Sequence, residues 1–396
     1  MLNYSIGAFM FFTVSTREDS RFPVNYKLTE KYTLNCDEGW QLITNDKSKI
    51  AVFKGYSFDD YNNLFDDPTP KHNGNFCLIY VNLNGEIIIT HDAERSFPLW
   101  FNETSYGNID IEQGTFIAAN SYLKISSNSF DSINFNIKNI INNNLCEDDA
   151  VDIIYNNLVT KFTWLKNNCP VTPNIFFTGG IDSLLCLSML RHLDIKHNLL
   201  MHEYIEYDQF SLNFYNIFED LNYYWGYSQI HYWNTPSWLI SGSMGDENFL
   251  RGPLNIHLLL QNRGLKIQDV LQKNAYHYEY FTKPSNINLQ IDSKLKFYTK
   301  NKAMLYEKII EINLNDHQHW HIGNTLTFTP FKDISILTTI LSMSDADIEK
   351  QMMDASLQKK IIAKAAPQLL KYLSKQKNTS YSTVWELYKD LYSGST

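Results

Sequence analysis

The chain of 396 residues lacks most of the features that mark secreted, membrane or nucleic-acid-binding proteins. Its five cysteines are odd in number and include no C-x-x-C pair, which argues against a disulfide framework or a zinc site. The net charge is −9 and no basic stripe is present, so nucleic acid is not an expected partner. The most apolar N-terminal run, Ile6 to Val14, is too short to cross a bilayer. We therefore expect a cytoplasmic protein with no membrane partner.

Length and composition instead favour a globular enzyme or binding protein with two domains. Hydrophobic residues make up 44% and aromatic residues 14% of the chain, enough to bury large cores. Up to about Leu123, short apolar runs alternate with turns, and the runs 75–82 and 86–91 flank a predicted hairpin at Asn84-Gly85. The polar, Asn-rich stretch from Ser126 to Asn144 predicts a linker. We accordingly divide the chain into domains at 1–130 and 131–396.

The second domain is organised around Asn174 to Leu187, NIFFTGGIDSLLCL. The apolar run predicts a buried strand, residues 178–183 a tight turn, and the following residues a helix. A helix predicted at 150–165 and a strand predicted at 198–204 complete the beginning of a doubly wound parallel sheet. Backbone N–H groups at the start of such a helix can bind an anion, and Gly179 and Gly180 let a phosphate approach closely. Thr178 and Ser183 would add hydroxyl donors.

A second glycine-containing turn follows the apolar residues Trp238 to Ile240. It reads Ser241-Gly242-Ser243-Met244-Gly245-Asp246, and we expect it to face the first turn from the end of another strand. Asp182 and Asp246 would then offer two carboxylates for a magnesium ion on nucleotide phosphates. The two turns together predict a site for a nucleotide pyrophosphate.

These segments resemble those of a known enzyme superfamily. The 178–183 turn lacks the lysine of G-x-x-x-x-G-K-[ST] and instead resembles the S-G-G-x-D-S loop of the N-type ATP pyrophosphatases. The 241–249 segment resembles S-G-x-G-x-D-E-L-F-G-G of asparagine synthetases. Thr329 to Leu337 resembles their V-P-F-L-D-x-x-L-V, which opens a late helix, and Lys375-Gln376-Lys377 resembles their R-x-K.

The resemblance implies a doubly wound ATP pyrophosphatase domain with C-terminal helices, using ATP and Mg²⁺. Lys377, with Lys375 as the fallback, would neutralise charge on the transferring phosphorus and on pyrophosphate. Asp182 and Asp246 would act with it as the metal ligands. The implied ATP-binding residues are Thr178, Gly179, Gly180, Asp182, Ser183 and Gly242.

The N-terminal domain carries a second resemblance. Gly74-Asn75-Phe76, the hairpin and the segment 91–101, HDAERSFPLWF, are similar to glutamine amidotransferase domains of the asparagine-synthetase type. This implies an Ntn-hydrolase-like αββα sandwich, so the whole chain would combine α+β and α/β parts. Glutamine hydrolysis needs an N-terminal cysteine whose free amine acts as its base, but residue 2 is Leu, and Ser5 is preceded by Met1. We expect a scaffolding domain without glutaminase activity.

Ser243 stands where asparagine synthetases have Glu and β-lactam synthetases Tyr, and a serine is not a base near neutral pH. The combination resembles lasso-peptide cyclases. It implies an AMP-forming carboxylate–amine ligase for peptide macrocyclisation in antibiotic biosynthesis, with a ribosomal precursor peptide as substrate and a leader-peptide protease as partner. A small-molecule amide or lactam synthetase and a catalytically silent binding protein are the alternatives. Sulfur transfer or nucleobase modification is disfavoured by the missing C-x-x-C pairs and basic face.

Two further segments have open interpretations. The aromatic-rich stretch 204–233 fits core packing between helices better than a peptide groove. His317, His319 and His321 alternate and would share one face of a strand. Without a fourth ligand signature, we interpret them as a polar wall or surface histidines rather than a zinc or copper site.

Overall fold

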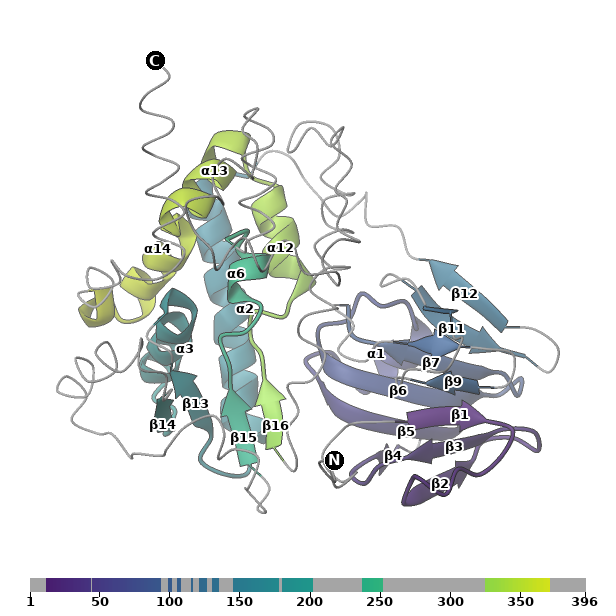
Figure 1. The fold of residues 1–396 in the computed structure, drawn as a ribbon. Coiled ribbons are helices and arrows are strands. Elements are labelled where there is room, and N and C mark those ends of the chain that lie inside the picture. Colours follow the sequence, from purple (N-terminus) through teal and green to yellow (C-terminus); the bar gives the residue numbers. More distant parts are fainter. Residues whose placement is uncertain are drawn as a thin grey trace, which may run out of the picture.

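The computed structural model describes residues 12–43, 45–93, 99–101, 105–107, 115–116, 121–126, 130–134, 145–177, 180–201, 237–251 and 325–370. Antiparallel strands come first along the chain, and a parallel sheet with helices follows (Figure 1). The prediction of a strand-rich first part followed by a parallel sheet with helices is confirmed. No helix in the described ranges is long and apolar enough to cross a membrane.

The N-terminal part consists, in the described ranges, of two six-stranded antiparallel sheets. The first has the order β10-β8-β9-β1-β3-β2 and contains β1 (Phe12–Ser15), β2 (Val24–Lys27), β3 (Thr33–Cys36), β8 (Trp100–Phe101), β9 (Ser105–Gly107) and β10 (Thr115–Phe116). The second has the order β12-β11-β7-β6-β5-β4 and contains β4 (Gln41–Leu42), β5 (Ser48–Ser57), β6 (Gly74–Asn82), β7 (Ile87–His91), β11 (Ser121–Ile125) and β12 (Phe130–Asn134).

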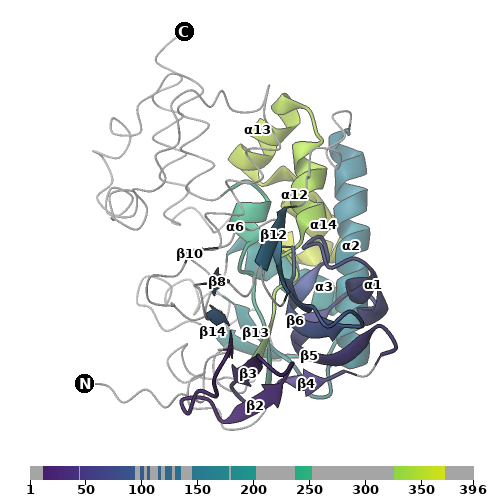
Figure 2. The same cartoon turned by 90° about the vertical axis from the view of Figure 1, so that its right-hand side faces the viewer.

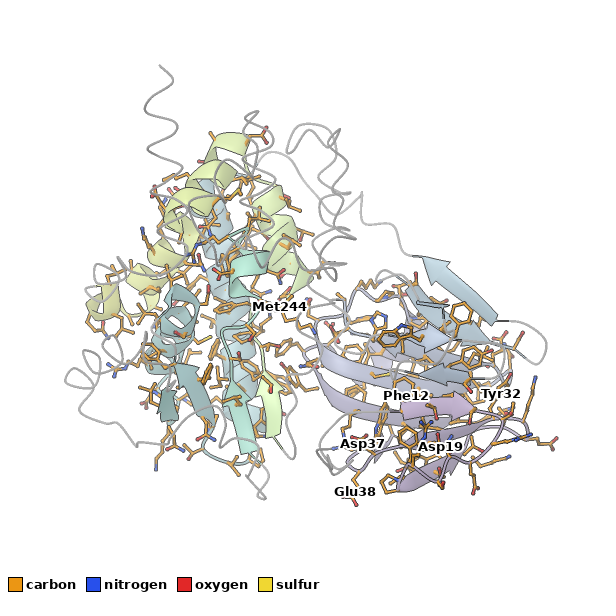
Figure 3. All side chains as sticks on the ribbon, in the orientation of Figure 1. Phe12, Asp19, Tyr32, Asp37, Glu38 and Met244 are labelled. Carbon is orange, nitrogen blue, oxygen red and sulfur yellow. The ribbon has the colours of Figure 1, made fainter. Side chains whose placement is uncertain are left out.

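Strand β6 shows how the two sheets pack. Its residues Cys77 and Ile79 point into a core shared with the first sheet, where Phe12 and Leu34 are fully buried. The alternate residues Phe76 and Leu78 face the other way and pack against helix α1 (Tyr61–Asp66). Because both faces are covered, the strand reads as a continuous apolar run. Figure 3 shows Phe12 and Tyr32 within this sandwich.

The predicted hairpin is confirmed, whereas the predicted linker is wrong in part. β6 and β7 pair antiparallel, and Gly85 between them has φ +85°, a left-handed conformation that favours glycine. Residues 130–134 of the predicted linker form β12, which pairs with β11. Their backbone groups hydrogen-bond to β11, and the polar composition of these residues does not reveal that pairing. The sheet thus continues four residues beyond position 130, and α1 is the only helix between β1 and β12 in the described residues.

The second part is built on a four-stranded parallel sheet of order β14-β13-β15-β16 in the described residues. Its strands are β13 (Asn174–Phe177), β14 (Asn198–Met201), β15 (Ser237–Ile240) and β16 (Thr325–Phe328). The helices are α2 (Glu147–Asn168), α3 (Ile181–His192), α6 (Gly245–Asn248), α12 (Ile334–Leu341), α13 (Asp345–Asp354) and α14 (Ser356–Ala365). The strand predicted around 175–177 is present as β13, and the strand predicted at 198–204 is present over its described residues 198–201. The helices predicted at 150–165, after the 178–183 turn and after 333 are present as α2, α3 and α12. Figure 2 shows α2 beside α12 and α14.

The four strands are parallel, but the direction in which successive strands are added to the sheet reverses at β13. From β13 the chain passes through α3 to β14 on one side, whereas β15 and β16 lie on the other side of β13. In open α/β sheets, ligands bind outside the carboxyl ends of the strands at such a reversal. The turns after β13 and β15 are therefore the expected position of a site.

Tyr56 joins the sandwich to the parallel sheet. Its ring centroid lies 5.5 Å from that of Trp164 and 5.9 Å from that of Phe328. Its hydroxyl oxygen accepts a 3.0 Å hydrogen bond from the Thr329 backbone N–H. Tyr56, at the end of β5, is thus part of the same buried cluster as the second part of the chain.

A buried ion pair joins α2 to the start of α12. Lys161 pairs with Asp333 and also donates a 2.7 Å hydrogen bond to the Pro330 carbonyl oxygen. Asp333 accepts from the Ser335 backbone N–H at 2.6 Å and thereby caps α12. Burial raises the pKa of Asp333, but the charge and hydrogen bond of Lys161 outweigh it and lower the pKa below its ordinary value. The aspartate of the TPFKD segment therefore has a structural role.

We predict that Lys161→Met lowers the free energy of unfolding by about 3–5 kcal/mol, because Asp333 would be left as an unpaired buried carboxylate. Urea unfolding at neutral pH measures the change. Lys166→Met, at an exposed position of the same helix, is the matched control. Equal losses in the two variants would contradict the assignment of a buried pair.

A second charge cluster holds the start of α2 against α13 and α14. Glu147 accepts hydrogen bonds from Lys350 and Lys360, each at 2.7 Å. Burial alone would raise the pKa of Glu147, but the two lysines outweigh it and hold the pKa at about 2. A carboxyl whose pKa is lowered by folding stabilises the fold above its ordinary pKa and loses this effect as the pH falls towards the lowered value.

We therefore predict that Glu147→Gln destabilises the protein at pH 7 by at most about 3 kcal/mol, since each unit of pKa shift corresponds to about 1.4 kcal/mol. The difference from wild type should shrink between about pH 4.5 and pH 2. Urea unfolding across this range, with Asp345→Asn at the exposed start of α13 as control, gives the comparison. A difference that does not change with pH would refute this role of Glu147.

Candidate active site

The structure describes part of the predicted site. Gly180, Asp182, Ser183, Gly242 and Asp246 are within the described residues. Thr178, Gly179, Lys375, Lys377, the histidines at 317, 319 and 321 and the aromatic stretch 204–233 lie outside them, so their predicted roles stay predictions.

The first turn leads into α3 with no side chain capping the helix. Gly180 occupies the N-cap position, and no side-chain hydrogen bond caps the first turn. Asp182 lies in that first turn, where a negative charge is favoured by the helix dipole. Ser183 is buried, and its hydroxyl donates a 2.9 Å hydrogen bond to the Gly180 carbonyl oxygen. The predicted role of this hydroxyl in binding the nucleotide stays a prediction.

The second turn, between β15 and α6, is closed by its own polar groups. The Ser241 and Ser243 hydroxyl oxygens are 2.6 Å apart, and the Gly245 N–H donates to the Gly242 carbonyl oxygen at 3.1 Å. Met244, visible in Figure 3, is buried at φ +67°. A left-handed non-glycine residue costs on the order of 1–3 kcal/mol and persists only where its surroundings enforce it. The buried surroundings of Met244 therefore hold this turn in its left-handed conformation.

The two turns touch at the backbone. A Cβ atom added to Gly245 would lie 2.3 Å from the Asp182 carboxyl carbon, and one added to Gly242 would lie 3.0 Å from the Ser183 nitrogen. Any side chain at position 245 would therefore displace the carboxylate. Gly242, predicted to contact ATP, is seen here to permit the close approach of the second turn to α3. The prediction that the two turns meet is confirmed.

Asp246 has a basic neighbour that the sequence interpretation missed. Arg251 Nη1 lies 3.4 Å from Asp246 Oδ1, and the Arg251 N–H donates to the Asp246 carbonyl oxygen at 2.5 Å. Leu250, before it, has φ +58°, a left-handed conformation. The only sequence signal was a charged residue five positions after the aspartate.

Asp182 also has a partner that no motif indicated. Gln358, on α14, donates a hydrogen bond from Nε2 to Asp182 Oδ1. These two residues are separated by 176 positions in the sequence. Only the packing of α14 against α3 brings them together.

The described donors suit magnesium held jointly with a nucleotide. In the described residues, no group of three or more His, Cys, Asp or Glu side chains gathers as a protein-only metal site. Two carboxylates on contacting turns match what Mg²⁺ uses when phosphate oxygens and water complete its octahedral shell. The chemistry of these two side chains thus fits this role.

A scan of the sequence against protein-family models finds no matching family, and a search of curated proteins finds no similar sequence. The site must accordingly be argued from its own residues.

We predict that Gly245→Ala destabilises the protein by about 1–3 kcal/mol through overpacking against the Asp182 carboxylate. Removing that carboxylate in the double variant Gly245→Ala/Asp182→Ala should recover part of the loss. Thermal unfolding of the four members of this double-mutant cycle measures the coupling. Additive effects of the two substitutions would show that position 245 tolerates a side chain without moving Asp182. Gly242→Ala should destabilise the protein less than Gly245→Ala, because its nearest contact would be 3.0 Å and not 2.3 Å.

Proposed function

We propose that the chain is an ATP-dependent carboxylate–amine ligase of the asparagine-synthetase-like superfamily. In this proposal, a substrate carboxylate attacks the α-phosphorus of ATP to give an acyl-adenylate and pyrophosphate, and an amine then displaces AMP. The observation that carries it is the contact between Asp182 and Gly245. This contact joins two acid-bearing turns at the carboxyl ends of adjacent parallel strands, where the strand order reverses.

The start of α3 and the two aspartates would bind the nucleotide together with Lys377. The backbone N–H groups at the start of α3 would bind phosphate oxygens. Asp182 and Asp246 would hold magnesium, which when bound neutralises charge on the phosphates. Lys377 remains the proposed cation for the leaving pyrophosphate.

The nitrogen donor is proposed to come with the substrate. The Ser243 hydroxyl lies 2.6 Å from the Ser241 hydroxyl, and neither group accepts a proton near neutral pH without help. We therefore favour capture of the adenylate by an amine of the same substrate, as in lasso-peptide cyclases acting on a ribosomal precursor peptide. Capture within a small molecule is the alternative.

The sandwich is proposed to be a scaffold of the Ntn-hydrolase type. Tyr56 is buried against the parallel sheet, and Lys332 Nζ lies 3.8 Å from Asp92 Oδ1 across the same boundary. These contacts support a structural role for the sandwich, which would hold β16 and the start of α12 in place.

We predict that Asp182→Asn abolishes AMP formation and weakens MgATP binding at least tenfold, because a neutral amide is a poor magnesium ligand. Calorimetry with MgATP gives the affinity, and chromatography gives the nucleotide products formed with a candidate precursor peptide. Asp345→Asn is the control at an exposed position. Leu2→Cys should not produce glutaminase activity.

Three outcomes separate the alternatives. ADP and phosphate as products would exclude adenylation. Unchanged MgATP binding in Asp182→Asn would exclude this metal assignment. A wild-type protein that binds neither MgATP nor pyrophosphate would identify a catalytically silent relative.

A further inference from the structure

Two buried glutamines lie beneath the candidate site. Gln351 on α13 and Gln358 on α14 both have 0% exposed surface. Buried amides are costly unless they are hydrogen-bonded, so their partners are informative. They connect the helices to both acid-bearing turns.

The orientation of Gln351 is set by backbone groups. Its Oε1 accepts a 2.8 Å hydrogen bond from the Leu357 N–H, and its Nε2 donates to the Phe249 carbonyl oxygen at 3.0 Å. A flipped amide would set like groups against each other at both contacts. Gln351 therefore presents its Nε2 donor, and not an acceptor, to its other neighbours.

That donor in turn orients Gln358. Gln351 Nε2 donates to Gln358 Oε1 at 3.1 Å, and Arg251 Nη1 approaches the same oxygen at 3.5 Å. With two donors facing its oxygen, Gln358 must turn its Nε2 towards Asp182. A chain of three hydrogen bonds thus links the Leu357 backbone N–H, through the side chains of Gln351 and Gln358, to the Asp182 carboxylate.

The same amide also reaches the second acid. Arg251, which approaches Gln358 Oε1, lies 3.4 Å from Asp246 Oδ1. Gln358 is thereby linked to one carboxylate directly and to the other through a single arginine. Its neutral amide orients Asp182 without neutralising it, whereas a lysine there would compete with a metal ion.

We propose that Gln358 is a positioning residue that holds the carboxylates of Asp182 and Asp246 in the arrangement that binds magnesium. This inference rests on the proposed nucleotide site. It assigns to α14 a task beyond packing: α14 presents the group that orders the two turns before the ligand arrives. Partners of metal ligands commonly contribute 10–100-fold to metal affinity.

The test compares Gln358→Met, which removes the amide, with Gln358→Glu, which keeps its size and replaces the donor by a carboxyl group. Gln368→Met, at an exposed position after α14, is the matched control. MgATP binding is measured by calorimetry over a series of free Mg²⁺ concentrations, and thermal unfolding establishes that each variant is folded. We expect Gln358→Met to need about 10–100-fold more Mg²⁺ for the same occupancy. Gln358→Glu should lose less, because its added carboxylate attracts the cation. Excess Mg²⁺ should restore binding, and Gln368→Met should match wild type.

A merely structural role would lower the unfolding temperature and leave the Mg²⁺ dependence of the folded protein unchanged, which would overturn the inference. That result would leave the proposed function intact, because wild type and variants would still bind MgATP. Failure of wild type itself to bind MgATP would instead remove the proposed function, and the role of Gln358 with it.

Discussion

The close approach of two backbone turns is the constraint on which the candidate site depends. Gly245 leaves room for the Asp182 carboxylate where a Cβ atom would lie 2.3 Å from its carboxyl carbon. This contact is possible because β13 and β15 are adjacent parallel strands whose carboxyl ends lie at one sheet edge. Met244 and Leu250, both in left-handed conformations, lie on either side of α6, the short helix that carries Asp246. Geometry that is costly locally is thus stabilised by the sheet beneath it.

Buried polar groups extend this order away from the turns. Gln351 and Gln358 connect α13 and α14 to both turns, and Lys161 connects α2 to the cap of α12. Tyr56 connects the sandwich to the residue that follows β16. Such networks stabilise one arrangement strongly only when every member is satisfied, because an unmade hydrogen bond in the interior is expensive. The helices around the sheet therefore cover the core and also supply hydrogen-bond partners to the residues of the candidate site.

Much of the architecture could be predicted because its signals are local. The hairpin at Asn84-Gly85, the amphipathic spacing of α2 and the strand–turn–helix around Asp182 each depend on neighbouring residues. Residues 130–134 were misassigned to a linker because this polar strand is stabilised by pairing with β11, and its composition does not reveal that pairing. Gln358 carried no signal, because its partner Asp182 lies 176 positions away. Arg251 gave only the weak signal of a charged residue five positions after Asp246.

The sequence by itself determined the order of the parts and the residue types at the two turns. Glycine, serine and aspartate at fixed spacing after apolar runs have few structural interpretations, because backbone conformation and strand periodicity are local properties. Only the tertiary structure decided that Gly245 packs on Asp182 and that Gln358 donates a hydrogen bond to the Asp182 carboxylate. These contacts join segments separated by tens to hundreds of residues, and their geometry depends on how helices and strands pack. The two acid-bearing turns were readable from the sequence, but their mutual support was not.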